Sequence, residues 1–451
     1  MPNLINTNQH ITMLYERGNK LKKKILISLT VSILLLTSFL AIIQVSAAGE
    51  SWPTFQHDYL RTGVADNTGP KTNTLVWKWY SGITMDYGEA IPESTALVAA
   101  VVDGKVFVGT EENRFVALDE FTGDLIWEFD TQGIVRTPPS VADGKVFFGS
   151  HDGNFYALDA NTGDLEWKYG PIDSGEFDVG IWTIGTVVAN GLVIFGAEDV
   201  YALDVDNGDL VWRQDFSGGY DWALGAASDG NLVLVPSLDA KLYALDLTTG
   251  DEVWSYETDS YIESVPAIGY GNVYVGSTDN QTYAIDLNTG ELVWKIEHGW
   301  SDLWGFGGGG WSHPALHNNR VVTAGTDGLL LSLDSQTGDI IWTFNTGNLT
   351  FGGVAIVDGV IYGGTYNNQF YAIDEANGEL IWEYVTDGPI NGGPAIVDGM
   401  MIWGSSDGYL YAIGEPVLPS EGIPVEYIYA GVAVVAIIII AVAVVVLKKK
   451  S

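Results

Sequence analysis

The fold is decided by a short stretch, residues 156–167, which reads Tyr-Ala-Leu-Asp-Ala-Asn-Thr-Gly-Asp-Leu-Glu-Trp. An apolar-Ala-apolar-Asp run leads into a turn that ends at Gly163, and Trp167 follows four residues later. Outward from this stretch the pattern occurs seven times along the chain. Its aspartates are Asp119, Asp159, Asp204, Asp246, Asp286, Asp334 and Asp374, and its tryptophans are Trp127, Trp167, Trp212, Trp254, Trp294, Trp342 and Trp382. The aspartates are spaced by 40, 45, 42, 40, 48 and 40 residues, a period typical of four-stranded β-propeller blades.

Each residue type in the repeat has a physical role in such a blade. The Asp carboxylate can cap the turn, and the Gly can adopt the positive φ that the turn requires. We therefore interpret the repeat aspartates as structural rather than catalytic. The Trp is a large apolar plate, and the small Ala leaves room for the plate of a neighbouring blade. Because no blade can bury its Trp alone, the blades must pack side by side.

The two ends of the repeat region predict how the ring closes. Near the C-terminus, Tyr411-Ala412-Ile413 is followed by Gly414 in place of the Asp, and no Trp strand follows. Residues 74–80 contain Trp77 without a preceding Ala-x-Asp run. The N-terminal strand is thus expected to complete the last blade, which leaves the ring without an open edge. We expect an all-β fold, an eight-bladed β-propeller of four-stranded antiparallel blades over residues 49–414.

The segments outside the propeller predict its cellular location. Residues 1–48 combine Lys20, Lys22, Lys23 and Lys24 with a long apolar run and small residues, as in a signal peptide or an uncleaved anchor. Residues 415–426 form a Pro-rich spacer, and residues 427–447 are uncharged and long enough for a transmembrane helix. Residues 448–451 are a basic tail that the positive-inside rule keeps cytoplasmic. We expect a single-pass protein of the cell membrane, with the propeller on the extracytoplasmic side.

The charge of the propeller region restricts its partners. Residues 49–426 contain 12 of the 20 Lys and Arg residues and 56 of the 57 Asp and Glu residues, a formal net charge of −44. Such a surface repels nucleic acid and attracts cations and basic partners, and the same charge also suits a solubilising coat for a salty or acidic exterior. We therefore expect no nucleic-acid partner. The chain contains no cysteine, which excludes disulfides and thiolate metal sites.

The repeat is similar to that of a known family. A Tyr-Ala-Leu-Asp run, a Thr-Gly turn and a Trp strand resemble the pyrroloquinoline-quinone-like (PQQ-like) repeat. That repeat occurs in the propeller subunit of the outer-membrane protein assembly machine and in quinoprotein alcohol dehydrogenases. The opening Trp52-Pro53-Thr54-Phe55-Gln56-His57-Asp58 also resembles the N-terminal stretch of this family. The resemblance covers roughly residues 50–414 and identifies a fold more specifically than a function.

The dehydrogenase branch of this family is the alternative reading. It implies a quinone stacked on a Trp, Ca²⁺ held by Glu, Asn and Asp, a catalytic Asp, and a disulfide between adjacent cysteines. The disulfide cannot form here, and we find no convergent calcium ligands and no common hydrolase or phosphate-loop motif. His313 and His317 would lie too far apart in a strand to share a metal ion. We therefore expect no catalytic residues, no metal and no cofactor; PQQ with Ca²⁺ enters only under the alternative reading.

Long loops lead into several inner strands and predict a binding surface at the mouth of the central channel. Alignment of the inner strands places Arg136, Trp182, Trp222, Glu263, Trp311 and Phe351 at or near one position, and the same loops add Trp304, Tyr220 and Asp221. Aromatic side chains with a few charges suit a protein or a glycan. The favoured function is a membrane-anchored binding or scaffold module for an extracytoplasmic partner, with basic proteins among the candidates. A PQQ-dependent dehydrogenase and a structural component of the cell envelope are the alternatives.

Overall fold

The structure is a computed structural model that describes residues 50–81, 98–172, 180–181, 185–216, 225–298, 313–325, 327–347, 352–390 and 392–418. Residues 50–418 form one compact unit. The predicted signal segment (1–48), transmembrane helix (427–447) and basic tail (448–451) lie outside the described residues. Within the described ranges, no helix has both the length and the apolar character needed to cross a bilayer.

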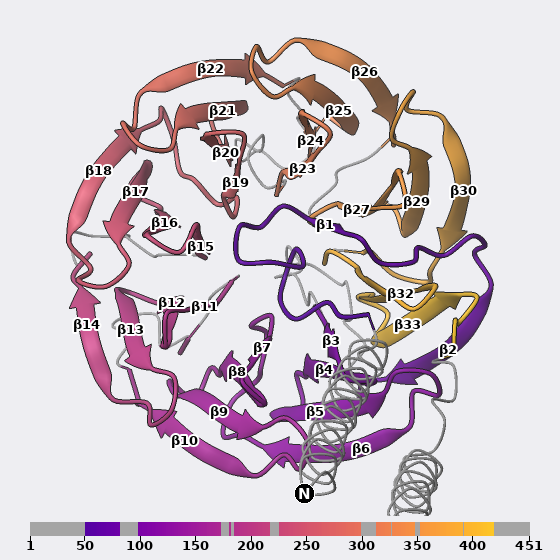
Figure 1. The fold of residues 1–451 in the computed structure, drawn as a ribbon. Coiled ribbons are helices and arrows are strands. Elements are labelled where there is room, and N and C mark those ends of the chain that lie inside the picture. The colour runs from indigo at the N-terminus through magenta and orange to yellow at the C-terminus, as the bar shows by residue number, and fades with distance from the viewer. Residues whose placement is uncertain are drawn as a thin grey trace, which may run out of the picture. The chain divides into compact units, whose positions relative to one another are not determined.

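The described chain is all β and forms eight sheets arranged in a ring, as predicted (Figure 1). Blade 1 contains β3 (Ala100–Val102), β4 (Lys105–Gly109), β5 (Arg114–Asp119) and β6 (Leu125–Asp130). Blade 2 contains β7 (Ser140–Ala142), β8 (Lys145–Gly149), β9 (Phe155–Asp159) and β10 (Leu165–Tyr169). Blade 3 contains β11 (Val187–Ala189), β12 (Leu192–Gly196), β13 (Val200–Asp204) and β14 (Leu210–Gln214). Blade 4 contains β15 (Ala227–Ser228), β16 (Leu232–Pro236), β17 (Lys241–Asp246) and β18 (Glu252–Glu257).

The second half of the ring repeats this arrangement. Blade 5 contains β19 (Ala267–Gly269), β20 (Asn272–Ser277), β21 (Gln281–Asp286) and β22 (Leu292–Glu297). Blade 6 contains β23 (Ala315–His317), β24 (Arg320–Ala324), β25 (Leu329–Asp334) and β26 (Ile340–Asn345). Blade 7 contains β27 (Ala355–Val357), β28 (Val360–Gly364), β29 (Gln369–Asp374) and β30 (Leu380–Val385), and β1 (Val64–Ala65) adds a parallel fifth strand to it. Blade 8 contains β31 (Ala395–Val397), β32 (Met400–Gly404), β33 (Tyr409–Gly414) and β2 (Leu75–Tyr80).

The ring closes through its N-terminal strand, as predicted. β2 pairs antiparallel with β33, and Trp77 lies opposite Ala412 in the register that the other blades use for Trp and Ala. The last blade therefore combines strands from both ends of the propeller region, and neither end can be lost without opening the ring.

The repeat tryptophans join each blade to the next. Seven indole N–H groups donate to a backbone carbonyl of the following blade at 2.8–3.3 Å. The donors are Trp77, Trp127, Trp167, Trp212, Trp254, Trp294 and Trp342, and the acceptors are Glu120, Ala160, Val205, Leu247, Leu287, Ser335 and Glu375. Each of these indoles also covers the turn glycine of that blade, where a Cβ atom would lie only 2.6–2.9 Å from the ring.

This packing corrects the role expected for the repeat alanine. Ala117 lies opposite Trp127 of its own blade, and the other repeat alanines pair in the same way. The neighbour's plate rests instead on the turn glycine, such as Gly163 beneath Trp127. Gly163 has a φ of +76°, so both the backbone conformation and the missing Cβ are needed at this position.

The repeat aspartates hold the turns on which these tryptophans rest. One carboxylate oxygen of each accepts the backbone N–H groups of the second and third following residues, at 2.8–3.2 Å. The acceptors are Asp119, Asp159, Asp204, Asp246, Asp286, Asp334 and Asp374. These carboxylates therefore stabilise the turns, as the sequence predicted.

The strand order gives the ring two different faces. We call the loop face the end that carries the turns between second and third strands, such as residues 110–113, and the loops between blades, such as residues 131–139. The turn face is the opposite end, with the short hairpin turns, such as residues 103–104, and the Asp-capped turns, such as residues 120–124. The predicted channel mouth belongs to the loop face.

Candidate functional site at the axis and loop face

The axis of the propeller is filled by its own N-terminal segment, which crosses the centre of the ring before β2 begins (Figure 1). Inner-strand amides of six blades donate to carbonyl groups of this segment at 2.7–2.8 Å; they belong to Val101, Val141, Ser228, Ile268, Leu316 and Ile356. In blade 8, the N–H of Gly399 donates to the carbonyl of Thr68 at 2.9 Å. We call residues 50–70 the hub segment, because they connect the blades at the centre.

Arg61 anchors the hub segment and is fully buried. Its guanidinium donates to the carbonyls of Thr186 (2.7 Å) and Ala226 (3.0 Å), in the third and fourth blades. It also donates to Thr54 Oγ1 at 2.8 Å and to the carbonyl of Phe55 at 2.6 Å. Burial lowers the pKa of Arg61 to about 10, which still leaves it charged at neutral pH. The carbonyl dipoles therefore replace the water that this cation loses on folding.

The loop-face end of the axis is closed by Phe55, Gln56 and His313. Phe55 packs edge-on against the His313 ring at a centroid distance of 5.0 Å and clusters with Val98 and Val265. The Gln56 side-chain amide donates to the carbonyl of His313 at 3.1 Å. His313 Nδ1 accepts the N–H of Val265 at 2.8 Å, so this nitrogen carries no proton. Burial, followed by the charge of Arg61, lowers the pKa of His313 to about 3.

Glycines let neighbouring blades meet near this end of the axis. Gly185 and Gly225 form a parallel bridge between blades 3 and 4. A Cβ atom on Gly352 would lie 2.8 Å from the backbone of Gly392, in the next blade. Together with Phe55, these contacts form the floor of the predicted channel mouth.

Two of the predicted mouth residues lie within the described chain. Arg136 Nε donates to Glu111 Oε1 at 2.9 Å, and this pair links a blade-connecting loop to a turn of blade 1. Glu263 lies in the loop before β19, and its Oε2 is buried without a hydrogen-bond partner among the described residues. Burial raises the pKa of Glu263 to about 7. The other predicted residues lie outside the described ranges: Trp182, Trp222, Trp311, Phe351, Trp304, Tyr220 and Asp221.

A second set of aspartates stabilises the loop face; the Asp-Gly pairs at 152–153 and 407–408 predicted turns there, but the bonds of these aspartates to tyrosine hydroxyls were not predicted. Each accepts a Tyr hydroxyl at 2.5–2.7 Å and caps its own turn; the pairs are Asp152–Tyr156, Asp239–Tyr243, Asp279–Tyr283 and Asp407–Tyr411. The signal was present, because each Asp precedes the Tyr of a Tyr-Ala repeat by four residues. These carboxylates belong to the scaffold of the loop face and are already engaged.

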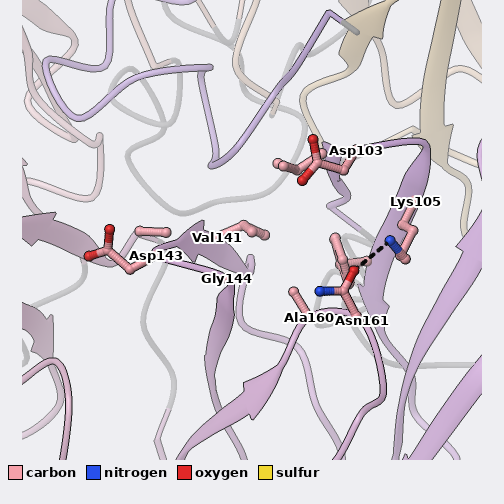
Figure 2. A pocket seen from close by; sticks show the side chains of 10 residues that line it. Asp103, Lys105, Val141, Asp143, Gly144, Ala160 and Asn161 are labelled. Carbon is pink, nitrogen blue, oxygen red and sulfur yellow. Dashed lines mark hydrogen bonds between the residues drawn. The ribbon is translucent and has the colours of Figure 1, made fainter. Parts of the chain in front are cut away.

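The turn face has a pocket of about 240 Å³ between blades 1 and 2 (Figure 2). Asp103, Lys105, Asp143 and Asn161 contribute polar groups to its lining, and Lys105 Nζ donates to Asn161 Oδ1 at 3.1 Å. Ala160 also lines it, where the next three seams place the larger Val205, Leu247 and Leu287. Because Ala160 is smaller than these three residues, it leaves room for the pocket at this seam. No motif in the sequence predicts this pocket.

Among the described residues, the axis shows no side-chain set that matches the cofactor site implied by the dehydrogenase branch. Phe55 and His313 occupy its loop-face end, and the Arg61 guanidinium is already engaged by backbone carbonyls. Within the described ranges, no three Asp, Glu or His side chains gather where they could ligate one ion. We therefore derive no redox step, and the absence of a cofactor stays a prediction.

The family model described as outer membrane protein assembly factor BamB matches residues 61–191, 196–343 and 326–415. The chain belongs to this family. The predicted resemblance to the PQQ-like repeat is thereby confirmed. A search of curated proteins found no match.

Solved structures show the same fold at low sequence identity. BamB from Moraxella catarrhalis matches with a TM-score of 0.59 and 18% identity, over 76% of this chain and 99% of that one. Quinohemoprotein alcohol dehydrogenase from Comamonas testosteroni matches with a TM-score of 0.67 and 17% identity, over 82% of each chain. The computationally designed Ika8 protein matches with a TM-score of 0.61 and 19% identity, over 72% of this chain and 97% of that one. These likenesses establish the architecture, which a binding protein, an enzyme and a design all share.

Proposed function

We propose that this protein is a membrane-anchored, extracytoplasmic scaffold that binds a protein partner through its loop face. The observation that carries the proposal is the filled axis. Among the described residues, the hub segment occupies the axis of the ring and is hydrogen-bonded to inner strands around it. We therefore expect a partner to bind at one of the two faces of the ring. The longest blade-connecting loops lie on the loop face.

The charge of the propeller favours a partner with a basic surface. Residues 49–426 have a formal net charge of −44, which steers a basic partner toward the ring. At the loop face, Arg136 forms an ion pair with Glu111, whereas Oε2 of the Glu263 carboxyl has no hydrogen-bond partner among the described residues. A Lys or Arg of the partner could pair with that carboxyl. The loop tryptophans would supply the aromatic anchors that dominate many interfaces.

The family description supports a role in binding a protein partner. Its description names an assembly factor for outer membrane proteins, which is a role in protein assembly rather than in redox chemistry. The quinohemoprotein neighbours share the fold at 17% identity, and their chemistry does not transfer at that level. The predicted membrane segment at residues 427–447 would hold the propeller at the membrane surface, next to proteins that are being assembled or folded.

The test combines partner capture with stability for the Trp222→Ala/Trp311→Ala double variant. We expect this variant to lose capture of the envelope protein that the wild-type chain retains, with little change in melting temperature. The matched control is Tyr270→Ala, which removes an exposed aromatic residue (38% exposed) from the turn face and should leave capture unchanged. Unchanged capture by the double variant, together with a large loss of stability, would show that these tryptophans only pack the loops.

A further inference from the structure

The seam between blades 8 and 1, where the ring closes, brings three carboxyl groups together. Glu120 follows β5 in blade 1, Asp398 lies in the turn after β31 in blade 8, and Glu50 begins the hub segment. Trp77 of the closing strand donates its indole N–H to the carbonyl of Glu120 at 2.8 Å. The acids therefore lie at the contact that joins the two ends of the propeller.

Glu50 is fully occupied as a hydrogen-bond acceptor. Its Oε2 accepts the backbone N–H groups of Thr68 (2.7 Å) and Asp398 (2.6 Å). Its Oε1 accepts the Thr68 hydroxyl at 2.6 Å. This carboxylate connects the hub segment to blade 8 and has no donor to offer its neighbours.

Glu120 is only 1% exposed, and neither of its carboxyl oxygens has a donor among the described residues. The charged groups that act on it are Asp398, Asp119 and Glu50, all of them acids. Burial first, and then Asp398, raise the pKa of Glu120 to about 8. Burial and Glu50 also raise the pKa of Asp398. Glu120 is buried and Asp398 is partly buried, and ionising both would place two negative charges side by side without a cation, so the pair favours keeping one proton.

The other seams do not contain such a pair. The positions equivalent to Glu120 carry Ala160, Val205, Leu247, Leu287, Ser335, Glu375 and Glu415. Glu375 is also buried, but its Oε2 lies 2.8 Å from Nδ1 of His317 in the preceding blade. Glu375 can therefore pair with the His317 ring and needs no second carboxyl as a partner. Among the described residues, the closing seam alone places a buried acid at this position next to a second acid.

We propose that the closing seam is a pH-responsive latch, in which Glu120 and Asp398 share one proton that bridges the last blade to the first. Because folding raises the affinity of Glu120 for this proton, the stabilisation is fully present below the usual carboxyl pKa of 4.5 and is lost as pH rises through about 8. Between those values, each pH unit lowers the folding equilibrium constant roughly tenfold. The ring would thus be tightest in mildly acidic surroundings and would loosen at the seam in alkali.

Thermal melts of the full-length chain between pH 7 and 9 test the latch. Ordinary carboxyls have finished titrating in this window, and Glu263, with a pKa of about 7, contributes only at its lower edge, so most of the fall in the wild-type melting temperature should come from the seam. Glu120→Gln replaces the shared proton with an amide donor that does not titrate, and the fall should largely disappear. Glu375→Gln, the control at the equivalent seam, should retain the wild-type fall. Equal slopes for wild type and Glu120→Gln would overturn the proposal.

An infrared measurement keeps the test valid if Glu120→Gln does not fold. At pH 7.5 the wild-type chain should show the C=O stretch of a protonated carboxylic acid. In Asp398→Asn the new amide can donate to Glu120 and the neighbouring negative charge is gone, so the pKa of Glu120 falls and its part of the band should shrink, while the contribution of Glu263 is the same in both chains. A wild-type spectrum without the band, or a band unchanged by the substitution, would contradict the shared proton.

Discussion

Replacing Trp77 with Ala should weaken the ring at its closing seam. Trp77 is 7% exposed, so nearly the whole indole is buried between β2 and blade 1. Burial of a Trp removes about 200 Å² from water, worth about 5 kcal/mol at 25 cal/mol per Å². The substitution also removes the 2.8 Å hydrogen bond to Glu120 and leaves that carbonyl without its donor, a further cost of about 1 kcal/mol. Because neighbouring side chains relax into part of the cavity, we expect a net loss of about 3–5 kcal/mol.

The assay is a thermal melt of the full-length chain, monitored by circular dichroism. For a cooperative unit of the size of residues 50–418, a loss of this magnitude lowers the melting temperature by roughly 4–6 °C. Trp382→Ala is the matched control, because Trp382 has the same place in its blade but is less buried, and its loss should cost less. If Trp77→Ala melts within a degree of wild type, the tryptophan does not hold the seam and the closure argument is wrong.

Three further outcomes follow from the structure and a fourth from the sequence. Gly163→Ala should destabilise the fold by about 2 kcal/mol more than Gly104→Ala in chemical denaturation, because both have a φ near +75° but only Gly163 supports a tryptophan ring. Arg61→Met should cost roughly 3 kcal/mol or more in the same assay, since it leaves buried carbonyls in two blades without a donor. Glu263→Gln should stabilise the chain relative to wild type increasingly as pH rises from 4.5 through 7 in thermal melts, because the raised pKa makes ionisation of the buried acid unfavourable to folding. Protease added outside intact cells should digest the propeller but spare a tag placed after Ser451, and loss of the tag would contradict the predicted topology.

The blade pattern was readable because it is local and repeated. The Asp, Gly and Trp of one repeat lie within nine residues of each other, and their spacing fixes turn, backbone conformation and apolar plate at once. Ring closure was also predictable, because Trp77 and Tyr411 each lacked the half of the pattern that the other supplied. The partner of the indole was not predictable, since it lies in the next blade. The sequence alone assigned the small space to Ala, whereas the structure assigns it to the turn glycine.

Contacts at the centre of the ring could not be predicted from local sequence patterns, because they join residues that are far apart in the chain. Arg61 is an unremarkable cation in the sequence, and only the convergence of blades around the axis makes it a buried anchor. Glu120 and Asp398 lie far apart along the chain, so their contact exists only because the ring closes. Of the predicted loop-face residues, Arg136 and Glu263 are placed by the structure, and the predicted tryptophans of the mouth await a direct test.

Photo-crosslinking in intact cells tests the proposed function most directly, because it reports which face contacts a partner. A photoreactive amino acid at Tyr261, which is 51% exposed and precedes β19 on the loop face, is compared with one at Tyr270, which is 38% exposed on the turn face. We predict a covalent adduct with a discrete envelope protein from position 261 and none from position 270. Adducts from position 270 alone, or from neither position, would contradict a scaffold that binds through its loop face.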